Sequence, residues 1–189
     1  MGASRLLPLV HAWAEGFDAA EIDWAVGGAL AMAGHGYTRE TQDIDLFFDP
    51  DAGQQVIEIL TKRGLHIEEI AAPYHFAFTP DRSRPDERID LLFPSSQPDI
   101  SAVVFPVRRV IDGRELPVWP IEHIVAAKLQ AHRPKDQNDL QALWNLRLFD
   151  PRAVAEVVEE LDDDEARMRL RNLCRKPAAV HVPMPPRRK

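Results

Sequence analysis

The segment from Gln42 to Phe48 constrains the fold more than any other part of the chain. Polar and apolar side chains alternate along it, as in a β-strand with one face in a core. The carboxylates of Asp43 and Asp45 are therefore expected to share one face of the strand, opposite three apolar side chains. One interpretation of such a pair is an exposed strand whose polar face is acidic by coincidence. Two ionised carboxylates this close also repel each other, and a hard cation such as Mg2+ relieves that repulsion.

The bulk composition predicts a globular protein without a membrane segment. The chain has 189 residues, of which 45% are hydrophobic, enough for one domain with a real core. No apolar stretch approaches the ~20 residues that span a bilayer, and the amino terminus lacks a secretory signal pattern, so a cytoplasmic location is expected. The single cysteine, Cys174, excludes an internal disulfide and a thiolate zinc site. Any metal is therefore expected to bind through oxygen.

The formal net charge of -7 argues against a protein that coats nucleic acid nonspecifically. The charge is uneven, however, because basic residues gather between Arg167 and Lys189. They predict either a solvated helix followed by a disordered tail or a contact with nucleic acid.

The order of periodic segments predicts an α+β fold, with a small mixed sheet backed by helices and then a carboxyl-terminal helical bundle. Strands are expected at 23–26, 42–48, 66–70, 75–78, 88–93 and 107–111. Helices are expected at 4–16, 29–34, 52–63, 121–132, 135–148, 151–161 and 165–176. The predicted domains are an α/β core at 1–119, a helical region at 120–176 and a flexible basic tail at 177–189.

The pair Gly27-Gly28 lies between a predicted strand and the start of a predicted helix. Unpaired N–H groups and a partial positive charge at such a turn favour phosphate, and glycine lets the backbone approach a bulky anion. An ordinary tight turn explains a Gly-Gly pair equally well. The Asp-x-Asp pattern that follows within about twenty residues favours a nucleotide site.

Asp90 lies in a later predicted strand whose alternate residues are apolar. It can join the sheet face that carries Asp43 and Asp45, and three carboxylates can hold two divalent ions. Asp90 is then a candidate general base for an attacking hydroxyl. The alternative is an edge-strand aspartate that pairs with Arg88 or Arg84.

Lys128 projects from the apolar stripe of the helix predicted at 121–132. It is expected either to extend to the surface or to reach a bound nucleotide. Asp136 and Asp139 share a stripe of the next helix. Asp136 can be the N-cap of that helix, with Asp139 favoured by the helix dipole, or both acids can orient Lys128 or bind substrate.

Taken together, these residues resemble the nucleotidyltransferase superfamily typified by DNA polymerase beta. The resemblance rests on Gly27-Gly28 at a strand-to-helix turn, on Arg39-x-Thr41-x-Asp43-Ile44-Asp45-Leu46, and on Asp90 in a later strand. Lys128 with Lys135-Asp136-x-x-Asp139-Leu140 resembles the abortive-infection type toxins within that superfamily. The resemblance covers residues 24 to 143.

The resemblance implies a transfer that depends on Mg2+ or Mn2+ and moves a nucleotide from a nucleoside triphosphate to a hydroxyl, with release of pyrophosphate. The roles it implies cover ten residues. Gly27 and Gly28 would cradle the triphosphate, with Arg39 and Thr41 near the phosphates or the incoming substrate. Asp43, Asp45 and Asp90 would bind metal, and Asp90 would also serve the attacking hydroxyl. Lys128 would contact the nucleotide, and Asp136 or Asp139 would support that pocket. One departure is that Gly28 and Ala29 stand where many members have a serine that holds a phosphate.

Three functions compete at this point. The first is a toxin that modifies RNA, such as the 3' end of tRNA, and that is silenced by a cognate antitoxin protein. The second is transfer to a small hydroxylated molecule of aminoglycoside type, whose positive charge suits the acidic chain. The third is a noncatalytic binding domain with the same fold. An Asp-x-Asp glycosyltransferase fits Gly27-Gly28 and Asp90 poorly.

Overall fold

The computed structural model describes residues 2–81 and 88–175, and these fold into two compact units. The first unit ends at Ile124 and the second begins at Val125, within one helix. The domain boundaries predicted from the sequence stay a prediction, and the tail predicted at 177–189 lies outside the described residues. No helix in the described ranges is long and apolar enough to cross a membrane.

The first unit holds a mixed sheet, as the sequence predicted. Its strands are β1 (Trp24–Val26), β2 (Ile44–Phe48), β3 (Glu68–Ala71), β4 (His75–Phe78), β5 (Ile89–Leu92), β6 (Val107–Ile111) and β7 (Arg114–Val118). They lie in the order β3-β4-β5-β2-β1-β7-β6. The pairs β2–β5 and β1–β7 are parallel, and the other neighbours are antiparallel.

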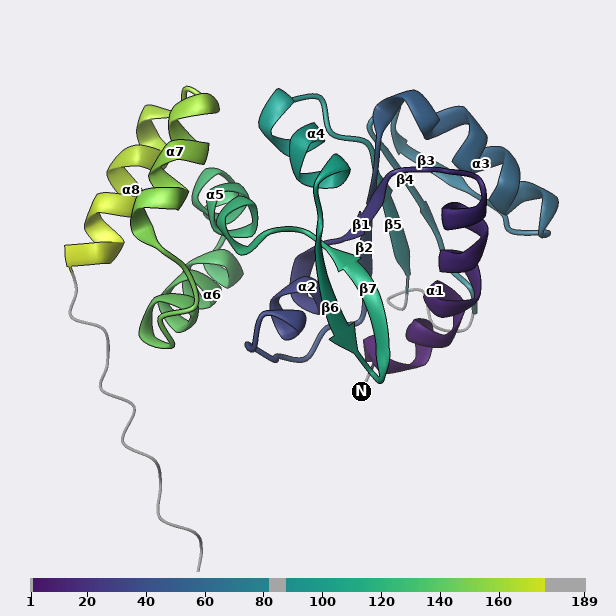
Figure 1. Cartoon of the computed structure of the whole chain (residues 1–189), viewed down its shortest axis with the longest axis horizontal. Helices are drawn as coiled ribbons and strands as arrows, with labels where there is room; N and C mark the ends of the chain where they lie inside the picture. Colours follow the sequence, from purple (N-terminus) through teal and green to yellow (C-terminus); the bar gives the residue numbers. More distant parts are fainter. Residues whose placement is uncertain (1, 82–87, 176–189) are drawn as a thin grey trace, which may run out of the picture. The chain divides into compact units, whose positions relative to one another are not determined.

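Helices cover this sheet from both sides (Figure 1). The helices of the first unit are α1 (Gly2–Ala19), α2 (Gly28–Gly34), the 3-10 helix η1 (Pro50–Ala52), α3 (Gly53–Lys62) and α4 (Gln97–Val104). The unit ends within the first turn of α5 (Ile121–Ala131). Figure 1 shows α1 and α3 on one side of the sheet and α2 on the other. The face toward α1 is therefore core, and the other face is available to a site next to α2.

The core beneath β2 follows from the alternation in its sequence. Ile44, Leu46 and Phe48 are fully buried, whereas Asp45 and Phe47 between them are half-buried. The ring of Phe48 packs edge-on against Phe17 of α1, with ring centroids 5.1 Å apart. Burial of large apolar side chains on one face thus orients Asp45 to the other.

The structure corrects several details of the sequence prediction. β2 begins at Ile44 rather than Gln42, so Asp43 immediately precedes the strand. β5 is an interior strand between β4 and β2, so Asp90 does not lie at a sheet edge. The sequence prediction also missed β7, whose Pro117 argues against a strand, and α4, a short helix capped by the Ser96 hydroxyl.

The second unit consists of helices in its described part: the rest of α5, α6 (Pro134–Asn145), α7 (Pro151–Glu160) and α8 (Asp164–Arg175). This agrees with the predicted carboxyl-terminal helical bundle. Arg169 connects α8 to the end of α5, because its guanidinium donates to the carbonyl oxygens of Leu129 and Gln130 at 2.7 and 3.0 Å.

We expect Phe48→Ala to lower the free energy of unfolding by about 3–5 kcal/mol, because it opens a cavity under the central strand. Phe105→Ala is the control, since Phe105 is 74% exposed, and it should change stability by less than about 0.5 kcal/mol. Urea denaturation followed by tryptophan fluorescence measures both. Equal losses in the two variants would contradict the assignment of Phe48 to the core.

Candidate functional site

Asp45 and Asp90 are direct neighbours in the sheet. β2 and β5 run parallel, and their register places Asp45 opposite Asp90, so the two residues share one face. Neighbouring strands lie about 4.8 Å apart, which brings the two carboxylates close together. Asp90 is only 3% exposed. The structure therefore places two acidic groups side by side in a half-buried setting, where their charges need compensation.

Gly28 fits against the carboxylate of Asp45. Its φ of +55° lies in the left-handed region, and a Cβ built on it would lie 1.8 Å from Asp45 Oδ2. Gly27 donates its backbone N–H to the carbonyl oxygen of Asp45 at 2.9 Å. Both the conformation and the lack of space require glycine at position 28. The strand-to-helix turn thus lies directly against the acidic pair.

Aromatic packing supports this turn. The ring of Phe47 stacks on Trp119 with centroids 4.0 Å apart, and a Cβ on Gly27 would lie 2.2 Å from the Phe47 ring. The Trp119 carbonyl in turn accepts from Nε2 of His35 at 2.8 Å. Burial lowers the pKa of His35, which favours the neutral ring. Nε2 carries the proton in this bond, because a carbonyl oxygen can only accept.

Thr41 and Asp43 interact with each other just before β2. The Thr41 hydroxyl donates to Asp43 Oδ1 in a short hydrogen bond. Arg39 precedes them in the same loop, where its guanidinium donates to the Glu40 carbonyl at 3.0 Å. The loop therefore brings Thr41 to Asp43, whereas the contact of Arg39 and Thr41 with a phosphate stays a prediction.

Asp90 has two basic partners. Its Oδ1 lies 2.6 Å from Nε2 of His75 on β4, and its Oδ2 accepts from Nε of Arg88 at 3.0 Å. Arg88 was one of the two partners considered from the sequence; the other, Arg84, lies outside the described residues. His75 was missed. Its only sequence signal was its place in the strand that directly precedes β5 in the chain, because consecutive strands often pair.

The acidic residues suit a divalent metal by chemistry. Carboxylate oxygens are the ligands that Mg2+ and Mn2+ prefer, and Asp45 and Asp90 stand in register on one face. Within residues 2–81 and 88–175, however, no three His, Cys, Asp or Glu side chains are arranged to hold an ion. His75 and Arg88 each hold one oxygen of Asp90. Metal binding by Asp43, Asp45 and Asp90 therefore stays a proposal.

The other predicted residues form a buried cluster in the second unit. Nζ of Lys128 donates to Asp136 Oδ1 at 3.2 Å and to Asp139 Oδ2 at 2.7 Å, and neither acid is more than 1% exposed. Lys128 itself is 8% exposed, so it does not extend into solvent. Of the alternatives weighed from the sequence, the structure shows the one in which both acids hold Lys128.

Asp136 is not the N-cap of α6, which corrects one of the sequence alternatives. Arg133 is the N-cap, and Asp136 stands at the third helical position, where Oδ2 accepts from the Arg133 backbone at 3.2 Å and from its Nε at 2.7 Å. Burial alone raises the pKa of Asp136, but the bonds from Arg133 and the charge of Lys128 outweigh it and hold the pKa below its ordinary value.

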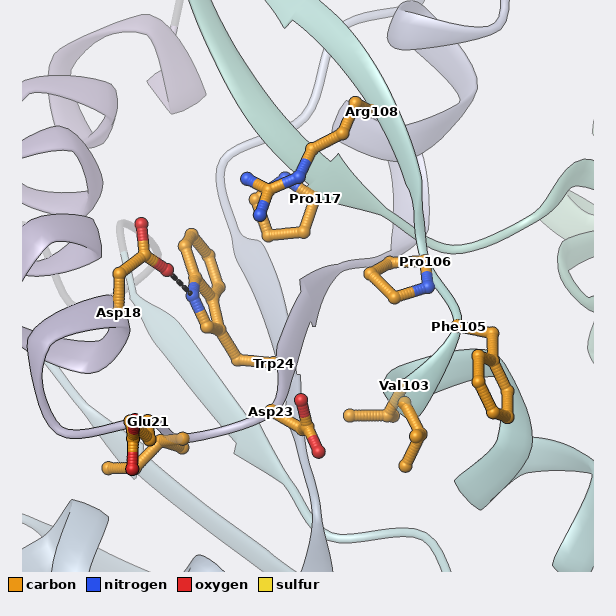
Figure 2. A pocket seen from close by; sticks show the side chains of 11 residues that line it. Asp18, Glu21, Asp23, Trp24, Val103, Phe105, Pro106, Arg108 and Pro117 are labelled. Atoms are coloured by element: carbon orange, nitrogen blue, oxygen red, sulfur yellow. Dashed lines mark hydrogen bonds between the residues drawn. The ribbon is translucent and has the colours of Figure 1, made fainter.

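A cavity of about 710 Å3 opens at the opposite end of β1 from Gly27 (Figure 2). Trp24, Phe105 and Arg108 are among its lining residues, and Trp24 Nε1 donates to Asp18 Oδ1 at 3.0 Å. No site residue predicted from the sequence lines it. The predicted chemistry therefore lies elsewhere, at the carboxyl end of β1.

We expect Gly28→Ala to destabilise the first unit and to impair any activity that depends on Asp45, because the added methyl group displaces its carboxylate. Gly64→Ala is the matched control: Gly64 also has a positive φ, +81°, but a Cβ there meets nothing within 4 Å. The control should lower the free energy of unfolding by only about 1 kcal/mol, the cost of a left-handed conformation at alanine. Gly28→Ala should lower it distinctly more. Thermal unfolding compares them, and equal losses would contradict the close approach.

We expect Lys128→Met to lower the free energy of unfolding by about 3–5 kcal/mol, because Asp136 and Asp139 lose a buried counter-charge. Lys62→Met is the control, since the Lys62 side chain is 79% exposed, and it should change stability by less than about 0.5 kcal/mol. Chemical denaturation at pH 7 measures both.

The Lys128–Asp136–Asp139 cluster makes the free energy of unfolding depend on pH in the acid range. Because the folded-state pKa of Asp136 is lowered, its stabilisation is fully present above the ordinary aspartate pKa and is lost as the pH falls through the lowered one. Asp136→Asn should therefore flatten the loss of stability below about pH 4. An unchanged acid profile would contradict this contribution.

Comparison with known proteins supports the family resemblance. The sequence model of the aminoglycoside-2''-adenylyltransferase family matches residues 9–143. No curated protein sequence matches the chain. The matched span contains every site residue predicted from the sequence.

Solved structures share the fold at low sequence identity. The antibiotic-resistance factor ANT(2'')-Ia in solution is 17% identical with a TM-score of 0.55, covering 92% of this chain and 90% of that chain. Its crystal structure in complex with adenylyl-2''-tobramycin is 17% identical with a TM-score of 0.54, covering 90% and 98%. An antigenic nucleotidyltransferase-like protein from Paracoccidioides brasiliensis is 18% identical with a TM-score of 0.58, covering 94% and 90%.

At these identities the structural likeness establishes only the fold, whereas the family match establishes the family. The noncatalytic alternative loses support, because the matching family is one of enzymes. Since the match spans well over half of the chain, the protein belongs to the aminoglycoside-2''-adenylyltransferase family and is a nucleotidyltransferase.

Proposed function

We propose that the protein transfers AMP from ATP to a hydroxyl group of a small, positively charged acceptor of aminoglycoside type. The observation that carries the proposal is the family match over residues 9–143. The net charge of -7 supports it, because an acidic protein attracts a polycationic acceptor. A relative of the same fold was solved with adenylyl-2''-tobramycin, the product of such a transfer.

Three aspartates provide the side chains for the transfer. Asp43, Asp45 and Asp90 would hold Mg2+ or Mn2+, which when bound neutralises phosphate charge and makes the acceptor hydroxyl more acidic. Asp90 accepts the proton of that hydroxyl. The acceptor oxygen then bonds to the α-phosphorus of ATP, the bond to the β-phosphate breaks, and pyrophosphate leaves.

The remaining predicted residues position the nucleotide. The Gly27-Gly28 turn lies against Asp45, so a triphosphate held by its backbone would lie beside the acidic pair. Arg39 and Thr41, in the loop before β2, are proposed to lie near the phosphates. Lys128, with Asp136 and Asp139, is proposed to support nucleotide binding.

An RNA-modifying toxin is the weaker candidate. It was the first hypothesis from the sequence, on the strength of Lys128, Asp136 and the basic carboxyl end. The family that matches is a different one, whose name describes a small-molecule acceptor, and the comparisons give no specific support to an RNA acceptor or to an antitoxin partner. The same assay separates the two candidates.

We expect label from ATP carrying a radioactive α-phosphate to appear in an aminoglycoside such as tobramycin when protein and Mg2+ are present. Total RNA in a parallel reaction should remain unlabelled. Label in RNA and none in any aminoglycoside would refute the proposed acceptor and support the toxin.

Asp45→Asn should lower the transfer rate at least about a hundredfold, because a metal-held charge contributes several kcal/mol to transition-state stabilisation. Asp51→Asn is the control, because Asp51 is an exposed carboxylate in η1, outside the acidic pair, and it should keep full activity. A fully active Asp45→Asn variant would exclude this residue from the chemistry.

A further inference from the structure

The row of residues that crosses the sheet at Asp90 extends beyond the acidic pair. β5 pairs with β4 on the side away from β2, and Ala77 stands opposite Asp90. β4 pairs in turn with β3, and Glu68 stands opposite Ala77. Residues directly opposite each other in neighbouring strands point to the same face of a sheet. The face of the acidic pair therefore holds one row of four residues: Asp45, Asp90, Ala77 and Glu68.

Glu68 lies within reach of a ligand that also contacts Asp90. Neighbouring strands are about 4.8 Å apart, so the backbones of Glu68 and Asp90, two strands apart, are separated by about 10 Å. Ala77 between them carries no charge. An aminoglycoside joins several amino-substituted rings and spans such a distance. One molecule can therefore present a hydroxyl at Asp90 and an ammonium group at Glu68.

Glu68 is an uncompensated acid beside the candidate site. It belongs to β3, an edge strand, and is exposed. Within residues 2–81 and 88–175 its carboxylate has no ion pair and no hydrogen-bond partner. The charge of Asp90, in contrast, is already balanced by Arg88. A cationic group that approaches the site from the side of β3 thus meets an opposite charge at Glu68.

Glu69 provides a comparison within the same strand. It follows Glu68 in β3 and is also exposed. It stands opposite Phe76, whose ring packs against Phe93 with centroids 5.9 Å apart, so Glu69 belongs to the other face of the sheet. Both acids place charge on an edge strand, which opposes edge-to-edge aggregation. Of the two, only Glu68 shares a face with Asp90.

We propose that Glu68 binds an ammonium group of the acceptor and so helps to position the acceptor hydroxyl at Asp90. The proposal deepens the proposed function and rests on it, because it names a residue that recognises the positive charge of an aminoglycoside-type acceptor. Glu68 contacts the acceptor alone, so it has no part in binding ATP.

Isothermal titration calorimetry with tobramycin tests the proposal without transfer of AMP, because no ATP is added. Glu68→Gln should weaken tobramycin binding about fivefold, the upper end of the range for one exposed ion pair. Glu68→Asp, which keeps the charge on a shorter side chain, should weaken binding less. Glu69→Gln is the matched control: it removes the same charge from the same strand but on the other face, and it should bind nearly as the wild type does.

Steady-state kinetics separate contact with the acceptor from a general effect on the fold. Glu68→Gln should raise the KM for tobramycin by a similar factor and leave the KM for ATP unchanged. In a series of aminoglycosides that each lack one amino group, the effect of Glu68→Gln should disappear for the compound that lacks the bound ammonium group.

Equal affinities of the Glu68→Gln and Glu69→Gln variants for tobramycin would overturn the proposal. An effect of Glu68→Gln that is the same for every compound of the series would overturn it as well. A chain that binds tobramycin through Glu68 but transfers no AMP to it would refute the proposed transfer and support the role of Glu68. A chain that binds no aminoglycoside would overturn both the role of Glu68 and the proposed acceptor.

Discussion

The parallel pairing of β2 with β5 is the interaction on which the candidate site depends. It sets Asp45 opposite Asp90, although 44 residues separate them in the chain (90 − 45 − 1). The apolar residues that alternate with them are fully buried against the helices on the other face. A shift of register by one residue would turn the carboxylates into the core, where unpaired charge is costly. The same burial that stabilises the fold therefore fixes the acidic pair.

Charge compensation around that pair explains the neighbouring side chains. Two carboxylates on one face require positive charge or donated protons nearby. In the structure Asp90 obtains both from His75 and Arg88. Gly28 approaches Asp45 closely enough to exclude any side chain at its own position. The site thus combines basic partners for one acid with a glycine backbone packed against the other.

The evidence for function comes from two levels. The residue pattern predicts the nucleotidyltransferase superfamily, and the family match shows that the chain belongs to the aminoglycoside-2''-adenylyltransferase family. The toxin resemblance rested on Lys128, Asp136 and Asp139. These residues form a buried ion cluster that joins α5 to α6, and this contact serves the fold whichever acceptor the protein uses. A cluster that also serves the fold in this way is weak evidence for the toxin branch of the superfamily.

The sequence by itself determined the alternation at 42–48, the Gly27-Gly28 turn and the place of Lys128 on an apolar stripe, because local periodicity and backbone freedom set these features. Only the tertiary structure decided that β5 pairs with β2 and that His75 reaches Asp90. Strand order depends on long-range packing, which local patterns do not record. The missed β7 has the same cause: Pro117 opposes a strand locally, yet pairing with β1 and β6 forms one.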